Sequence, residues 1–344
     1  MRIGILTGGG DCPGLNPAIR GFVLKALEYG WECRGYLNGW KGLVEGSYKP
    51  LVLEDVQDII IQGGTILGSS RTNPFRPGKE ADLEATLKNI KEHGLDAVVA
   101  LGGEDTLGVA NKLHKLGIPA VGVPKTMDND LNATDFTFGF DSAVAVATES
   151  IDRLRDTARS HNRVMVVEVM GRHAGWVALY SGIAGGADWI TLPEVDLNVE
   201  EMCNHLLSVR ERGRNYSIVV ASEGTEIPQS EDADQTLDAF GHMILRDRGV
   251  GEYLAKEIEI RTGIETRFAV LGHIQRGGAP SVFDRVLASR LGMKAAELVK
   301  NGEFGKMASI QSNQIVGVNL EDAVASLKTV PDTMYEEAKV LFKR

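Results

Sequence analysis

The chain has 344 residues, of which 43% are hydrophobic and 24% are charged, and these values predict a globular protein of about two domains. Its 47 acidic and 37 basic residues give a formal net charge of −10, and no basic stripe interrupts the acidic excess, so we expect no nucleic-acid partner. The three cysteines, Cys12, Cys33 and Cys203, form no CxxC pair, so neither a disulfide framework nor a zinc ribbon is predicted.

The first ten residues, MRIGILTGGG, run directly into a strand-like segment and lack the apolar core and cleavage site of a signal peptide. No apolar run in the sequence is long enough to span a bilayer, so we expect no membrane contact. Widely spaced cysteines suit a reducing compartment. Together these features predict a cytoplasmic protein.

Short runs of apolar and β-branched residues, typical of buried strands, alternate with amphipathic stretches that are typical of helices. In chain order we expect a strand at 3–6, helices at 18–29 and 81–92, a strand at 97–101, a helix at 107–116, a strand at 120–123, a helix at 142–158, strands at 164–169, 218–221 and 268–271, and a helix at 282–298. This alternation predicts the α/β class, with parallel sheets that are covered on both faces and bind ligands at the C-terminal ends of their strands.

Glycines fill the segment TGGGDCPG, residues 7–14, between the first predicted strand and the first predicted helix. Glycine lets the backbone approach an anion closely, and a helix N-terminus supplies free N–H groups and a partial positive charge. The same composition also suits a turn that is only tight. The segment has neither the Walker spacing nor the GxGxxG spacing of a dinucleotide fold.

Charged residues follow two further predicted strands. The segment GGEDT, residues 102–106, brings two carboxylates to the start of a helix, where acidic residues also act as ordinary caps. The segment PKTMDND, residues 124–130, contains Lys125, Asp128 and Asp130, although DND alone is also a common turn. If these strand ends converge, the carboxylates repel one another unless magnesium and phosphate groups balance their charges.

Six motifs, TGGGDCPGLN, GGTILGSSR, GGEDT, PKTMDND, SHNRVMVVEVMGRHAGW and GHIQRGG, occur in this order, and the chain resembles the bacterial phosphofructokinases from residue 3 to about residue 298. The resemblance implies the phosphofructokinase fold, with two Rossmann-like three-layer α/β domains and mainly parallel sheets. Residues 1–139 plus about 275–325 would form the donor domain. Residues 140–274 plus about 326–344 would form the sugar-phosphate domain, with fructose 6-phosphate bound between the two.

The resemblance also implies roles for individual residues. Asp128 matches the general base that takes the proton from the sugar 1-hydroxyl, which suits a carboxylate beside positive groups. Further catalytic residues are Thr126, Arg172, Asp105 and Lys125; the donor site is Gly10, Arg71, Gly103, Asp105 and Lys125; and the sugar-phosphate site is Thr126, Met127, Asp128, Arg163, Met170, Gly171, Arg172, Glu223, Arg267, His273, Ile274, Gln275 and Arg276.

Two implications concern groups outside a single chain. The implied ligands of Mg²⁺ are Glu104 and Asp130. Glu104 lies at a position where the family usually has aspartate. Arg163 and Arg267 match arginines that reach into the neighbouring subunit's site, so the resemblance implies a homodimer or a homotetramer.

The phosphoryl donor is predicted from two positions. Members of the family that use ATP usually carry glycine where this chain has Asp105 and Lys125. An aspartate where the nucleotide α-phosphate would lie brings like charges together, while a lysine suits a short and highly charged donor, so we expect pyrophosphate. An ATP-dependent 6-phosphofructokinase is the alternative. A non-catalytic sugar-phosphate sensor is a remote one, which the intact Asp128 argues against.

Regulation and one segment are less well defined by the sequence. The family's effector pocket includes an arginine pair, of which Arg20 is present while Leu24 replaces the second member, so we expect little allosteric control. Residues 224–238 are acidic and have no hydrophobic period, and we interpret them as a surface insertion without an assigned function.

Overall fold

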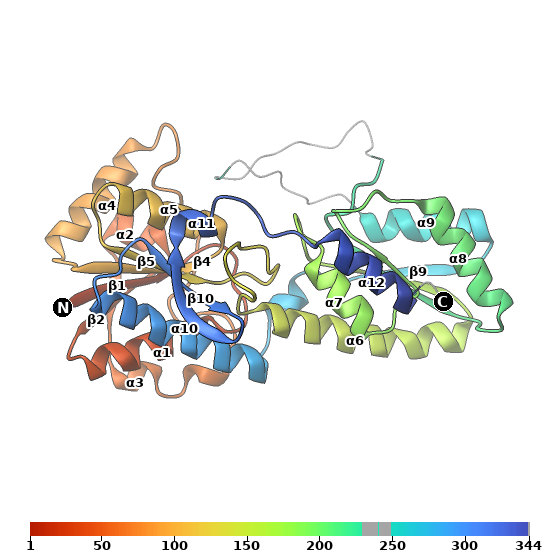
Figure 1. The fold of residues 1–344 in the computed structure, drawn as a ribbon, viewed down its shortest axis with the longest axis horizontal. Coiled ribbons are helices and arrows are strands. Elements are labelled where there is room, and N and C mark those ends of the chain that lie inside the picture. Colours follow the sequence, from red (N-terminus) through yellow and green to blue (C-terminus); the bar gives the residue numbers. More distant parts are fainter. Residues whose placement is uncertain (229–239, 241–248, 343–344) are drawn as a thin grey trace.

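Two β-sheets lie end to end along the longest axis of the molecule (Figure 1), in a computed structural model that describes residues 1–228, 240 and 249–342. Most of the predicted acidic insertion, residues 229–238, lies outside the described residues. Within this described part of the chain, no helix combines the length and the apolar character that crossing a bilayer requires.

The first sheet has the strand order β11-β10-β5-β4-β1-β2-β3. Its inner strands are parallel, and an antiparallel strand closes each edge, β3 beside β2 and β11 beside β10. The expected mainly parallel sheet is therefore confirmed. The strands are β1 (Arg2–Thr7), β2 (Glu32–Tyr36), β3 (Tyr48–Leu51), β4 (Ala97–Gly102), β5 (Ala120–Pro124), β10 (Lys306–Gln311) and β11 (Gln314–Asn319).

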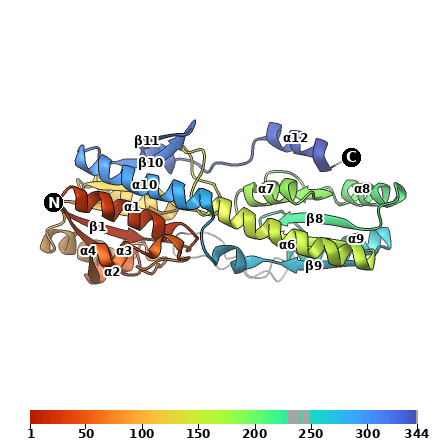
Figure 2. The same cartoon turned by 90° about the horizontal axis from the view of Figure 1, so that it is seen from below.

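Helices cover both faces of this sheet because its strands are apolar on both sides. Ile3 and Ile5 of β1 share a core with α1 and α10, whereas Leu6 shares a core with α2, α4, α5 and α11 (Figures 1 and 2). The helices are α1 (Leu15–Glu28), α2 (Trp40–Glu45), α3 (Leu53–Val56), the 3₁₀ helix η1 (Ile59–Ile61), α4 (Glu80–Glu92), α5 (Glu104–Lys115), α10 (Val282–Lys300) and α11 (Leu320–Ala323).

The second sheet is entirely parallel and has the order β7-β8-β6-β9. The helices α6 and α7 pack against each other, as do α8 and α9, and α12 at the C-terminus packs on α7. The elements are α6 (Phe140–His161), β6 (Val164–Val169), α7 (Trp176–Ala184), β7 (Trp189–Thr191), α8 (Val199–Glu211), β8 (Ser217–Ser222), α9 (Val250–Thr262), β9 (Thr266–Val270), the 3₁₀ helix η2 (Gly272–Arg276) and α12 (Asp332–Phe342).

The strands of the two sheets come from different parts of the chain. Strands between residues 2 and 124 and between residues 306 and 319 form the first sheet, and strands between residues 164 and 270 form the second. The last helix, α12, contributes Tyr335 and Phe342 to the core of the second sheet. The proposed boundaries near residues 139, 275 and 326 stay predictions.

A buried carboxylate, that of Asp284, joins the N-terminal ends of α6 and α10, at two places where the chain passes from one sheet to the other. Asp284 lies in the first turn of α10, and Ser142 lies at the start of α6. The carboxylate of Asp284 accepts two hydrogen bonds from Ser142, one from the main-chain N–H at 2.8 Å and one from the hydroxyl at 2.6 Å. The main-chain N–H of Ser281 donates to the same hydroxyl at 2.9 Å. Burial raises the pKa of Asp284 to about 6, although these hydrogen bonds act in the opposite direction.

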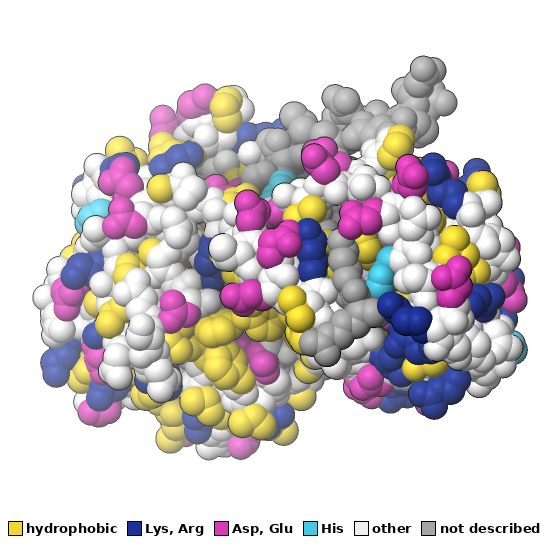
Figure 3. All heavy atoms as spheres, turned by 45° about the vertical axis from the view of Figure 1, so that its right-hand side comes forward, with side chains coloured by type: hydrophobic (Ala, Val, Ile, Leu, Met, Phe, Trp, Pro, Cys, Tyr) yellow, Lys and Arg dark blue, Asp and Glu magenta, His cyan; other side chains and the backbone are white. Residues whose placement is uncertain are grey.

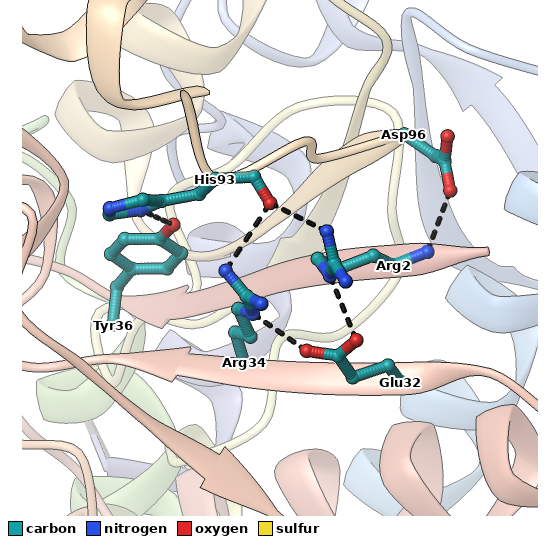
Figure 4. A network of polar contacts seen from close by, with 6 residues as sticks. All are labelled: Arg2, Glu32, Arg34, Tyr36, His93 and Asp96. Carbon is teal, nitrogen blue, oxygen red and sulfur yellow. Dashed lines mark hydrogen bonds and ion pairs between the residues drawn. The ribbon is translucent and has the colours of Figure 1, made fainter. Parts of the chain in front are cut away.

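A polar network ties the N-terminal ends of β1 and β2 to the turn after α4 (Figure 4). Glu32 accepts hydrogen bonds from Arg2 and Arg34, both at 2.8 Å, and the two arginines also donate to the carbonyl of His93. These contacts fix the register at one end of the strands. The glycine-rich and charged loops at residues 7–14, 102–106 and 124–130 lie at the opposite, C-terminal end of the strands.

Candidate active site

Three loops with glycines and charged side chains meet at the C-terminal edge of the first sheet. They follow β1, β4 and β5, which are neighbours in that sheet. These loops and those after β6, β8 and β9 of the second sheet line a cleft of about 650 Å³. Figure 3 shows acidic, basic and histidine side chains along the boundary between the two halves of the molecule.

Most of the predicted site residues line this cleft. They are Gly10, Arg71, Gly103, Glu104, Asp105, Lys125, Thr126, Met127, Asp128, Asp130, Met170, Arg172, Glu223, His273 and Arg276. Among the described residues that were predicted for the site, Arg163, Gly171, Arg267, Ile274 and Gln275 do not belong to the lining.

Gly10, in the loop after β1, lies between two cationic side chains from other loops. A Cβ atom added at Gly10 would lie 2.0 Å from Nη1 of Arg276, and this nitrogen also donates to the carbonyl of Asp11 at 3.2 Å. The carbonyl of Gly10 accepts a hydrogen bond from Nζ of Lys125. Glycine at this position leaves the space that the guanidinium group of Arg276 occupies.

Lys125 is only 4% exposed, although it carries an ammonium group. Burial lowers its pKa, and the nearby carboxylates of Asp128 and Asp11 oppose that shift. A buried cation that is only partly compensated by neighbouring groups is suited to an anionic ligand in the cleft.

The loop after β5 is held by its own side chains. The hydroxyl of Thr126 accepts from the main-chain N–H of Asp128 at 3.2 Å, and the hydroxyl of Thr137 donates to the carbonyl of Thr126 at 2.6 Å. Between Asp128 and Asp130, Asn129 adopts a left-handed conformation with φ of 51°. This conformation is tolerated by asparagine better than by most residues, and it separates the two carboxylates along the chain.

Asp128 has the properties of a general base at neutral pH. Burial, and then the charge of Asp130, raise its pKa to about 7. Its Oδ1 atom is buried and accepts no hydrogen bond from the residues that the structure describes. Because Asp128 lines the cleft, a carboxylate with a raised pKa at this place can take a proton from a hydroxyl bound there.

The predicted magnesium ligands, Glu104 and Asp130, both line the cleft. The described residues hold no group of three or more His, Cys, Asp or Glu side chains arranged for a metal ion. Magnesium in a phosphoryl-transfer site is usually bound by only one or two carboxylates, because water and phosphate oxygens complete its shell. Burial raises the pKa of Asp130 despite a hydrogen bond from Thr126, a cost that a nearby dication would offset, so the donor set fits magnesium.

The other wall of the cleft comes from the loops after β6 and β8. Gly171 has φ of 135°, and an added Cβ atom would lie 2.8 Å from the carbonyl of Ala174. Its own carbonyl accepts from the hydroxyl of Ser222 at 2.6 Å. Burial raises the pKa of Glu223, which lines the cleft near Gly171. The glycine therefore shapes the backbone that places Met170 and Arg172 at the cleft.

Two predicted sugar-site residues in η2 point elsewhere. The side chain of Ile274 is 68% exposed, whereas Gln275 is fully buried. Oε1 of Gln275 accepts the main-chain N–H of Met170 at 2.8 Å. This hydrogen bond joins η2 to the loop after β6, which indicates that Gln275 orients the wall of the cleft.

Arg163 and Arg267 lie at the other end of their strands, immediately before β6 and near the start of β9. Both form ion pairs with Glu265, at 3.3 Å and 2.8 Å respectively. They are therefore not brought together with the cleft of the same chain.

Several residues of the cleft were missed from the sequence, among them Asp11, Thr106, Glu168, His173 and Phe240. Glu168 had a visible signal, because it interrupts the apolar strand VMVVEV. Its carboxylate is buried and accepts the main-chain N–H of Gly251 at 2.7 Å, at the start of α9. Asp11, Thr106 and His173 lie within motifs that the sequence singles out, whereas Phe240 has no comparable signal in its local sequence.

The family model described as phosphofructokinase matches residues 2–299. A protein of Dictyoglomus thermophilum named pyrophosphate--fructose 6-phosphate 1-phosphotransferase is 53% identical over 100% of this chain and 99% of its own length. A protein of Streptomyces coelicolor named ATP-dependent 6-phosphofructokinase 3 is 49% identical over 98% and 99% of the two chains.

Among solved structures, the phosphofructokinase of Pichia pastoris in its T-state is similar to this chain, with a TM-score of 0.82 and 33% sequence identity. The similarity covers 99% of this chain and 36% of the Pichia chain, so this chain spans about a third of that larger protein.

Proposed function

Because this chain belongs to the phosphofructokinase family, we propose that it transfers a phosphoryl group from pyrophosphate to the 1-hydroxyl of D-fructose 6-phosphate. The products are fructose 1,6-bisphosphate and phosphate. The observation that supports this proposal most strongly is that Asp105, Lys125 and Gly10 all line one cleft. The bonds broken and formed are of comparable energy, so we expect the reaction to be reversible.

The choice of donor rests on charge. Asp105 lies in the first turn of α5, where its carboxylate neutralises the partial positive charge that would otherwise attract a further phosphate. Lys125 supplies a compact cation at the phosphate loop. The two phosphates of pyrophosphate would be attracted by Lys125 without extending as far as Asp105. A nucleotide would be attracted by Lys125 too, but its α-phosphate would be repelled by the carboxylate of Asp105.

The proposed chemistry assigns Asp128 as the general base. Its carboxylate takes the proton from the 1-hydroxyl while the sugar oxygen bonds to the transferred phosphorus and the phosphate leaves. Lys125, Arg172 and Arg276 line the same cleft and would stabilise the negative charge on the phosphoryl oxygens. Thr126 orients the loop through the main-chain N–H of Asp128.

Glu104 and Asp130 are the residues that would hold magnesium. When bound there, the ion would neutralise charge on the phosphate oxygens of the donor.

The remaining predicted contacts concern the sugar phosphate and a partner subunit. Glu223 would accept hydrogen bonds from sugar hydroxyls, and His273 would bind the 6-phosphate. Arg163 and Arg267, which lie outside the cleft of their own chain, would complete the site of a second copy in a homodimer or homotetramer. Exposed apolar side chains at Ile274, Val282 and Val286 support such an assembly. A cytoplasmic location stays a prediction from the sequence.

An ATP-dependent 6-phosphofructokinase is the second candidate, because a relative with that name is 49% identical. A sugar-phosphate sensor without activity is a weaker one, since Asp128 retains both its position in the cleft and its raised pKa.

The proposal is tested by incubating the purified protein with fructose 6-phosphate, magnesium and pyrophosphate, and by measuring fructose 1,6-bisphosphate and released phosphate. We expect equal amounts of both products. Formation of phosphate without the bisphosphate would indicate a pyrophosphatase. If neither product forms with pyrophosphate, and no bisphosphate forms with ATP in a parallel reaction, the sensor would be supported.

A further inference from the structure

The segment between α11 and α12 passes directly behind the loop that carries Asp128. Nζ of Lys328 donates hydrogen bonds to Oδ1 of Asn129 at 3.1 Å and to the carbonyls of Thr134 and Asp135, both at 2.9 Å. Its main-chain N–H donates to the carbonyl of Asp130 at 2.8 Å. The neighbouring Leu327 forms an isolated antiparallel bridge with Leu131.

The side chain that Lys328 contacts belongs to the residue between the two carboxylates. Asn129 is buried, and its Oδ1 atom also accepts the main-chain N–H of Thr137 at 3.0 Å. The backbone of Asn129 is left-handed, with φ of 51°, a conformation that asparagine tolerates, and the hydrogen bonds that its Oδ1 atom accepts from Thr137 and Lys328 hold the residue in place. Because Asn129 lies between Asp128 and Asp130, its backbone conformation determines how the side chains of the two aspartates are directed relative to each other.

The other end of the same segment contacts the second half of the molecule. The carbonyl of Lys328 accepts a hydrogen bond from the indole Nε1–H of Trp176 at 2.8 Å. The main-chain N–H of Val330 donates a hydrogen bond to Oε1 of Glu194 at 2.9 Å. Glu194 in turn accepts the main-chain N–H of Gly175 at 2.9 Å. Gly175 and Trp176 directly follow the loop that carries Met170 and Arg172.

We propose that Lys328 is a positioning residue for phosphoryl transfer, which holds the Asp128 loop through Asn129 and fixes it relative to the loop that carries Arg172. Lys328 acts from behind the loop and is not among the described residues that line the cleft. The inference rests on the proposed function, because it concerns the reaction assigned to Asp128. It adds a segment outside residues 2–299, the part of the chain that the family model matches.

The first test compares Lys328→Met with the unchanged protein in the pyrophosphate assay. Losing the three donated hydrogen bonds frees the loop, and small displacements of a reacting group reduce turnover strongly, so we expect kcat to fall about 10- to 100-fold. We expect KM for fructose 6-phosphate and for pyrophosphate to stay within about twofold, because the residues of the cleft are unchanged. Lys115→Met is the matched control, since Lys115 also bonds across segments, to Glu321 at 2.7 Å, but on the exposed surface.

A double-mutant cycle separates positioning from a general loss of stability. Asn129→Gly removes the acceptor while permitting the same positive φ, and it provides the test even if Lys328→Met does not fold. If Lys328 acts mainly through Asn129, adding Lys328→Met to Asn129→Gly lowers kcat much less than it does in the unchanged protein, since only the bonds to the carbonyls of Thr134 and Asp135 are then left to lose. Independent, multiplying effects would overturn the inference, as would a kcat for either single variant equal to that of the unchanged protein.

Hydrogen exchange gives a readout that does not depend on activity. In Lys328→Met we expect faster exchange of the amides of residues 125–137, the loop after β5, while the exchange rates of the strands of the first sheet stay unchanged. If the unchanged protein is inactive with both donors, the proposed function fails, while exchange still reports on the loop. If it is active but neither exchange nor kcat responds to Lys328→Met, only the present inference is wrong.

Discussion

The ammonium group of Lys125 donates a hydrogen bond to the main-chain carbonyl of Gly10, so the loop after β5 is joined to the glycine-rich loop after β1. Both loops follow strands that lie in one sheet with β4 between them. A cation held at this place by the backbone itself is available to a phosphate without first ordering a long side chain.

Replacing Lys125 with methionine keeps the length of the side chain and removes its charge. We expect kcat/KM for pyrophosphate to fall by about 100-fold or more, because a preorganised donor to the transferring group is lost. Steady-state kinetics with pyrophosphate as the varied substrate measure this. An unchanged kcat/KM would mean that Lys125 only stabilises the loop.

Replacing Asp128 with asparagine keeps the shape of the side chain and removes the base. We expect kcat to fall by about 100- to 10,000-fold, while the affinity for fructose 6-phosphate, measured by calorimetry, is retained. Retained turnover would exclude Asp128 as the base.

Replacing Arg267 with alanine tests whether a second subunit completes the site. Arg267 lies outside the cleft of its own chain, yet we expect KM for fructose 6-phosphate to rise about tenfold or more, because a cation donated to the partner's sugar phosphate is lost. Light scattering establishes the oligomeric state of the variant. If KM for fructose 6-phosphate is unchanged in an intact oligomer, Arg267 does not contribute to the partner's sugar-phosphate site.

The pH dependence of stability should report on Asp284. Its pKa is raised from 3.8 to about 6 in the folded protein, so the folded state holds this proton more tightly than the unfolded state does. The contribution of Asp284 to stability is therefore fully present below pH 3.8 and is lost as the pH rises through about 6.

Asp284→Asn removes this titration and should change the pH profile of stability. Between pH 7 and pH 4.5, the free energy of unfolding of the unchanged protein should rise relative to the variant by roughly 2 kcal/mol. Urea denaturation at the two pH values measures the difference. A difference that does not vary with pH would show that Asp284 titrates normally.

The sequence predicts the centre of the fold and the chemistry of the cleft because both have local signals. The strands β1, β4 and β5 are apolar runs that are followed directly by glycines or a charged residue, so the sequence alone locates their C-terminal ends. The strand β2, with the sequence ECRGY, lacks such a run, since Glu32 and Arg34 belong to the polar network at its end. The hairpin of β10 and β11 turns at Ser312 and Asn313, both with positive φ, a weak signal in one sequence.

Contacts between distant positions could not be predicted from local patterns. Gln275 looks like a ligand-binding polar residue, but its burial depends on the main-chain N–H of Met170, 105 residues away. Lys328 meets Asn129 across 199 residues, and an isolated lysine in a loop reads as a surface charge. Arg163 and Arg267 match arginines of the family that the chain resembles, whereas their position outside the cleft of their own chain becomes visible only in the fold.

Whether pyrophosphate is the phosphoryl donor can be decided by comparing kcat/KM for pyrophosphate and for ATP in the unchanged protein and in Asp105→Gly. We expect the unchanged protein to prefer pyrophosphate by about 100-fold or more, and Asp105→Gly to gain activity with ATP, because the repelling carboxylate is removed. Efficient turnover of the unchanged protein with ATP, and none with pyrophosphate, would contradict the roles proposed for Asp105 and Lys125 while leaving Asp128 as the base of a 6-phosphofructokinase.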